Sequence, residues 1–113
     1  IACDNDPVVL PEALHNFELN QQGQHFWGVV GTAKAIDERA PLVISNMLLE
    51  ELKSEVADLA RLTATGGTLI CSGLLTEQEA SLADALAKYG LRICASTEAE
   101  GWSAFAFREA GKF

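Results

Sequence analysis

Two polar residues stand directly after apolar, strand-like runs, and their types suit the binding of a small ligand. Asp4 follows residues 1–3, and Asn46 follows residues 42–45. The carboxyl edge of an open α/β sheet is where such folds bind ligands, so both side chains are expected at that edge. A carboxylate can accept hydrogen bonds from both hydroxyls of a ribose, and an amide offers a donor and an acceptor. The pair therefore points to a nucleotide-like ligand.

Each of these positions also has a purely structural interpretation. Asp4 could be a solvated turn residue or a partner of Asp6, which is itself best explained as the N-cap of the following helix. Asn46 could equally cap the helix that follows it, because Asn is a common N-cap. Gly73, after Ser72 at the end of the next strand, permits either close backbone approach to a ligand or a tight turn. The residues alone leave these alternatives open.

An alternation of strands and helices must position these residues. Apolar runs and turn signals predict strands at residues 1–3, 25–30, 42–45, 68–72, 91–97 and 102–108. Helical spacing predicts helices at residues 7–20, 48–62 and 76–89, with a loop at 31–41. This order predicts one α/β domain over residues 1–113, with a Rossmann-like, mostly parallel sheet and helices on both faces. The last two strands, joined by a short turn, should form an antiparallel hairpin.

Composition excludes several classes of function. The chain has 113 residues and a net charge of −8, with no basic cluster that could neutralise a phosphate backbone, so nucleic-acid binding is not expected. It has no apolar run of the roughly 20 residues that a bilayer crossing needs, so no membrane association is expected either. An acidic surface would tolerate a basic protein substrate, although it is also a common solubility device.

The cysteines and histidines do not suggest a metal site. Cys3, Cys71 and Cys94 are an odd number without a CxxC spacing, so buried, reduced thiols in a cytoplasmic protein are the expectation. His15 and His25 have no carboxylate or cysteine at metal-ligand spacing. Trp102 could wall a substrate pocket, although packing in the core or half-buried on the sheet is the more common role for such a residue.

Several segments, spread over nearly the whole chain, carry a specific likeness. They are Ala2-Cys3-Asp4-Asn5-Asp6-Pro7, Asn16 with Asn20, Val43-Ile44-Ser45-Asn46-Met47-Leu48, Gly66-Gly67-Thr68-Leu69-Ile70, Ser72-Gly73-Leu74-Leu75 with Glu77-Gln78, and Glu100-Gly101-Trp102. With these segments the chain resembles the ribosomal protein L11 methyltransferase family. These are class I enzymes that depend on S-adenosylmethionine. A dinucleotide-binding oxidoreductase fits the Ser-Gly-Leu-Leu and Trp segments less well.

The resemblance assigns roles to the two polar residues. It implies that Asp4 binds the ribose of S-adenosylmethionine and that Asn46 faces both the cofactor and the acceptor amine, as a catalytic and cofactor-binding residue. The implied acceptor is an amine of a protein, such as a ribosomal protein, and catalysis would consist mostly of positioning and desolvation without a metal. Residues 47–49 supply no aromatic side chain for stacking on a base, which argues against a nucleobase acceptor.

The chain also departs from the family pattern. The family has a strand and a Gly-rich turn before the Asp4 segment, and this chain lacks both, so it resembles the rear two-thirds of a catalytic domain without its usual first strand. We therefore expect the chain alone to bind S-adenosylmethionine weakly or not at all and to be inactive. The missing strand would leave two unpaired strand edges. Either the strands at residues 1–3 and 42–45 pair directly, or a second copy fills the gap and forms a homodimer. The alternative function is a non-enzymatic, degenerate methyltransferase-like module for binding or assembly.

Overall fold

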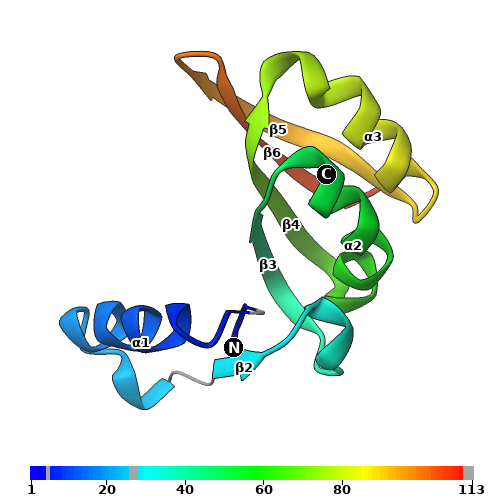
Figure 1. Ribbon diagram of the computed structural model, residues 1–113. Coiled ribbons are helices and arrows are strands. Elements are labelled where there is room, and N and C mark those ends of the chain that lie inside the picture. The colour runs from blue at the N-terminus through cyan, green and yellow to red at the C-terminus, as the bar shows by residue number, and fades with distance from the viewer. Residues whose placement is uncertain (5, 26–27, 111–113) are drawn as a thin grey trace. The chain divides into compact units, whose positions relative to one another are not determined.

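A computed structural model describes residues 1–4, 6–25 and 28–110 of the chain (Figure 1). The chain divides into two compact units, Ile1–Asp37 and Glu38–Phe113, and each is described by itself. No helix in the described ranges has the length and apolar character that a membrane crossing requires.

The first unit is a small βαβ arrangement. Strand β1 (Ala2–Asp4) pairs in parallel with β2 (Gly28–Val30), so that Asp4 lies opposite Val30. The connection contains α1 (Val9–Leu19) and the short 3-10 helix η1 (Gly23–His25). A second 3-10 turn, η2 (Ala33–Ala35), follows β2. A parallel pair needs such a crossover, so the predicted strand–helix–strand order of this segment is confirmed.

Two details of the first unit differ from the sequence-based expectation. The N-cap of α1 is Val8 rather than Asp6, because residues 7 and 8 form a turn before the helix begins. The Asp6 carboxylate instead accepts a hydrogen bond from the Val8 amide at 2.9 Å. The strand predicted from residue 25 is shorter, since Gly23–His25 is a 3-10 helix and Phe26 and Trp27 lie outside the described residues.

The second unit contains a four-stranded mixed sheet. Its strand order is β3-β4-β6-β5, with β3 parallel to β4 and the other two pairs antiparallel. The strands are β3 (Ala40–Asn46), β4 (Thr63–Leu75), β5 (Leu91–Ala99) and β6 (Trp102–Glu109). The α/β class and the antiparallel C-terminal hairpin are confirmed. The second strand of that hairpin is the inner one, beside β4.

Two helices cover one face of this sheet. Helix α2 (Leu49–Leu62) follows β3, and α3 (Glu79–Ala87) follows β4 after the short turn η3 (Thr76–Gln78). The helices pack against each other on the same face (Figure 1). Their apolar stripes meet apolar residues of the sheet. This core comprises Leu52, Val56, Leu59, Leu62, Leu69, Cys71, Leu74, Leu82, Leu86, Leu91, Phe105 and Phe107. Each fully buried Leu stabilises the unit by about 1.5–3 kcal/mol.

A tight turn joins β5 to β6. Glu100 and Gly101 have φ values of 54° and 84°, and they stand between the paired residues Ala99 and Trp102. Two consecutive left-handed residues are typical of a type I′ turn, whose twist matches that of the flanking strands. The turn therefore fixes the register at which β6 begins, and it places Trp102 opposite Leu75 of β4.

The three cysteines differ in environment. Cys71 is fully buried, and desolvation raises its thiol pKa to about 12. Cys3 is partly buried, with its Sγ 3.1 Å from the Gly31 carbonyl oxygen. Cys94 is exposed, so the expectation that all three thiols are buried was wrong. The β5–β6 register shifts between Ile93 and Ala95, and an irregularity of this kind changes the direction in which the side chain of residue 94 points.

We predict that a thiol-labelling reagent modifies Cys94 in the native chain at mildly alkaline pH but leaves Cys71 unmodified. The thiolate is the reactive form, and burial of Cys71 keeps it both protonated and inaccessible. Mass spectrometry of digested, labelled protein would measure the two rates, with labelling in denaturant as the control. Equal native rates at Cys71 and Cys94 would contradict this packing.

Candidate functional site

Asn46 lies where β3 ends, held in place by the parallel ladder to β4. In the register, Ser45 lies opposite Cys71 and Asn46 opposite Ser72. The ladder continues one step past the strand, because the Met47 amide donates to the Ser72 carbonyl at 3.3 Å. The Asn46 side chain is exposed. The predicted position of this residue, at the carboxyl end of a strand, is confirmed.

Asn46 does not cap the following helix. Helix α2 begins at Leu49, its N-cap is Leu48, and no side-chain hydrogen bond caps it. Within the described residues, the carboxamide of Asn46 has no hydrogen-bond partner. Of the two interpretations that the sequence left open, capping is therefore excluded, and the amide remains available to a ligand.

Gly73 is what allows the Asn46 carboxamide to take this position. A Cβ added at residue 73 would collide with Oδ1 of Asn46, and the backbone φ of Gly73 is +80°. The β4–β6 register shifts between Cys71 and Leu74, so this glycine lies in an irregularity of β4 rather than in a turn between elements. The group that approaches Gly73 is the Asn46 side chain, so the tight-turn interpretation does not describe this glycine. Close approach of its backbone to a ligand stays a prediction.

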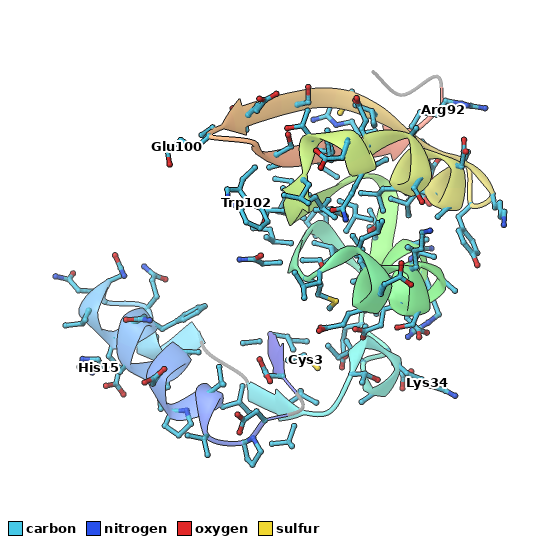
Figure 2. The ribbon with its side chains drawn as sticks, turned by 45° about the horizontal axis from the view of Figure 1, so that its top comes forward. Cys3, His15, Lys34, Arg92, Glu100 and Trp102 are labelled. Carbon is cyan, nitrogen blue, oxygen red and sulfur yellow. The ribbon has the colours of Figure 1, made fainter. Side chains whose placement is uncertain are left out.

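A pocket of about 320 Å³ opens beside Gly73 at this end of the sheet. Its walls come from the start of α2, the end of β4, the turn η3 and the start of β6. The lining residues are Leu48, Leu49, Glu50, Glu51, Gly73, Leu75, Gln78 and Trp102. Trp102 is 52% exposed, so packing in the core is excluded. It lies half-buried on the sheet and lines this pocket, whose role as a substrate pocket stays a prediction. Figure 2 shows Trp102 and Glu100 at one end of the sheet and Arg92 at the other.

Hydrogen bonds between η3 and the β5–β6 turn hold the Trp102 side of the pocket. The Thr76 hydroxyl lies 2.9 Å from the Ser103 hydroxyl and donates to the Gly101 carbonyl at 3.2 Å. The Thr76 amide bonds to the same carbonyl at 3.2 Å. On the other side of η3, the Gln78 side chain accepts a hydrogen bond from the Leu75 amide at 2.9 Å. These contacts fix Leu75 and Trp102 as neighbouring walls.

Asp4 is engaged in a local turn. One oxygen of its carboxylate accepts a hydrogen bond from the Asp6 amide at 2.8 Å, and its own carbonyl accepts from the Gly31 amide at 2.9 Å. The interpretation of Asp4 as a partner of Asp6 is thus confirmed. The contact also orients the carboxylate at the end of β1. A role in binding ribose stays a prediction.

Sequence reasoning missed most of the pocket lining. Leu48 was placed inside the helix predicted over residues 48–62, but it precedes α2 and is 63% exposed. Glu50 and Glu51 were not singled out at all, although they follow Asn46 by four and five positions. Their place in the first turn of α2 was the available signal, since a helix that follows a strand end presents its first turn at the same edge.

Residues 1–110 match the family model described as "Ribosomal protein L11 methyltransferase (PrmA)". The chain belongs to this family. It is 35% identical over 111 residues to the ribosomal protein L11 methyltransferase of Geobacter sulfurreducens, a match that covers 98% of this chain and 36% of that protein. For the relative from Bradyrhizobium diazoefficiens, identity is 33% over 116 residues, covering 98% and 39%. The chain thus spans little more than a third of the length of these relatives.

Solved structures agree with a Rossmann-like methyltransferase fold. The ribosomal protein L11 methylase from Lactobacillus delbrueckii subsp. bulgaricus superimposes with a TM-score of 0.85 at 24% identity, over 96% of this chain and 56% of that one. The N-methyltransferase NodS from Bradyrhizobium japonicum, in complex with S-adenosyl-L-homocysteine, gives a TM-score of 0.68 at 12% identity, over 96% and 65%. At these identities the likeness establishes the fold alone.

In this member of the ribosomal protein L11 methyltransferase family, we predict that Gly73→Ala displaces the Asn46 side chain. Because the carboxamide is the movable end of an exposed side chain, it should rotate away from the new methyl group. The free energy of unfolding should then fall by about 1–2 kcal/mol, which is the cost of placing Ala in the left-handed region. Shifted side-chain amide signals of Asn46 in a ¹⁵N NMR spectrum would report the displacement.

Gly66→Ala is the matched control, because Gly66 also has a positive φ, of +78°, and nothing lies within 4 Å of its added Cβ. This variant should lose similar stability in urea unfolding while the Asn46 side-chain signals stay in place. Unmoved Asn46 signals in Gly73→Ala would contradict the close approach.

Proposed function

We propose that this chain supplies the acceptor-facing part of an S-adenosylmethionine-dependent N-methyltransferase that acts on amines of a protein such as ribosomal protein L11. The observation that carries the proposal is the Asn46 carboxamide, which is exposed, without a hydrogen-bond partner in the described residues and held beside a pocket by Gly73. Membership of the ribosomal protein L11 methyltransferase family supports the same reading.

In this proposal Asn46 orients the acceptor. A lysine or α-amino group must be neutral to act as a nucleophile, since the ammonium form has no lone pair. The Asn46 Oδ1 can accept a hydrogen bond from an N–H of the neutral amine, which leaves the lone pair directed away from the carboxamide. Orientation of this kind is how the site would contribute to the rate.

The residues present fit a bound S-adenosylmethionine in their chemistry. When bound, this group supplies an electrophilic methyl on a sulfonium. The Asp4 carboxylate, oriented by the Asp6 amide, would accept hydrogen bonds from the ribose hydroxyls through its second oxygen. Asn46, with its donor and its acceptor, would serve the cofactor as well as the amine. A cytoplasmic location belongs to the proposal, because ribosomal proteins are made and assembled there.

A second candidate function is a non-enzymatic module for binding or assembly. The observation in its favour is the outer strand β3, which carries the exposed side chains of Leu42 and Ile44, at 52% and 65%. An exposed apolar edge strand is a template for pairing, and a homodimer formed through it would suit such a module. The two candidates differ in their dependence on Asn46, which assembly through β3 would not require.

The decisive experiment is a chimera in which this chain replaces the segment that it matches in the Geobacter sulfurreducens relative. We predict that the chimera methylates ribosomal protein L11 and that Asn46→Ala lowers kcat by about 100-fold, the scale of effect that misplaced reactants produce. Asp4→Ala should raise KM for S-adenosylmethionine. Mass spectrometry of L11 would count the methyl groups.

Gln22→Ala removes an exposed amide after α1 and should leave kcat unchanged. A folded chimera, shown by circular dichroism, that leaves L11 unmethylated would overturn the proposed function. An Asn46→Ala chimera with full kcat would overturn the role of Asn46.

A further inference from the structure

The pocket beside Gly73 combines apolar walls with an acidic rim. Leu48, Leu75 and Trp102 are exposed by 63%, 36% and 52%, which are large values for apolar side chains gathered in one cavity. The rim carries the carboxylates of Glu50 and Glu51, both exposed in the first turn of α2. Among the described residues that line the pocket there is no Lys, Arg or His.

The two halves of the pocket match one kind of group. A long aliphatic chain that ends in a cation buries its stem against apolar surface and keeps its charged head at a polar rim. The face of an indole also attracts a cation. Acidic residues in the first turn of a helix favour the helix by themselves, but that effect does not account for an exposed Trp and two exposed Leu residues beside them. The net charge of −8 further favours a basic partner.

We propose that this pocket binds a Lys or Arg side chain of the protein substrate, and that this side chain is an anchor next to the residue whose amine is methylated. Leu48, Leu75 and Trp102 hold its aliphatic stem, and Glu50 and Glu51 bind its cationic end. That the occupant belongs to the protein substrate rests on the proposed function. It makes Glu50 and Glu51 specificity-determining residues that select acceptor sites with a neighbouring positive charge.

The anchor and the acceptor are different residues for a physical reason. A carboxylate near an amine favours the ammonium form, and the ammonium form has no lone pair. Two carboxylates therefore suit a side chain that stays charged throughout the reaction. The acceptor amine belongs instead at Asn46, whose neutral carboxamide does not stabilise a positive charge in the same way.

The test measures the binding of a short peptide to the 113-residue chain. NMR monitors the indole N–H signal of Trp102, and the variant Trp102→Phe assigns that signal. The probe is acetyl-Ala-Lys-Ala-amide, and its partner has norleucine in place of lysine, which keeps the stem and removes the charge. We expect the lysine peptide to shift the Trp102 signal and the amides of Glu50 and Glu51, with weaker binding at high salt. The norleucine peptide should bind several-fold more weakly.

Two double variants with the same change in net charge separate the effect of the rim carboxylates from that of overall charge. Glu50→Gln with Glu51→Gln should raise Kd for the lysine peptide about threefold to tenfold, the scale expected for two exposed ion pairs. Asp37→Asn with Glu38→Gln changes the net charge equally at two exposed acids that precede the other end of β3, and Kd should not change. Because both pairs keep hydrogen-bonding side chains, spectra of the two variants should retain the native dispersion.

Three results would overturn the proposal: equal binding of the lysine and norleucine peptides, equal effects of the two variant pairs, or displacement of the peptide from Trp102 by S-adenosylhomocysteine, which would assign the pocket to the cofactor. Asn46→Ala separates this proposal from the proposed function. It should leave peptide Kd unchanged while it lowers methyl transfer in the chimera, so either idea can fail without the other.

Discussion

The Asn46 carboxamide can lie over β4 only because residue 73 carries no Cβ. That contact depends on the parallel register of β3 and β4, which sets Asn46 opposite Ser72 and carries the ladder on to Met47. It also depends on the irregularity of β4, where Gly73 adopts a positive φ. The same glycine lines the pocket. This glycine therefore allows the position of the Asn46 carboxamide and also forms part of the pocket wall.

The rest of the second unit makes that edge rigid. Helices α2 and α3 bury their leucines against one face of the sheet. The ends of β3 and β4 are therefore supported by a packed core on that face. The hydrogen bonds of Thr76 with Gly101 and Ser103 connect η3 to the turn and the start of β6. Trp102 thus forms a fixed wall, and the exposed apolar surface of the pocket persists because its supports are buried or hydrogen-bonded.

The sequence predicted the order of elements well, because alternating apolar runs and turn residues are local signals. It also predicted Asn46 and Gly73 at the sheet edge, since a polar residue after a buried strand has few other places to lie. The sequence failed where strand register determines which face a side chain lies on. Cys94 is exposed at an irregularity between β5 and β6, and no local pattern marks that shift. Leu48 was misplaced, and Asp6 was taken as the N-cap, because helix starts are uncertain by one or two residues.

The central claim is that the Asn46 carboxamide lies over Gly73 instead of capping α2. The most direct measurement is a nuclear Overhauser spectrum of the isotope-labelled chain, read at the side-chain amide protons of Asn46. The structure predicts cross-peaks from these protons to the α-protons of Gly73. Cross-peaks to the backbone amide protons of Glu50 and Glu51 in the first turn of α2, without any to Gly73, would contradict it.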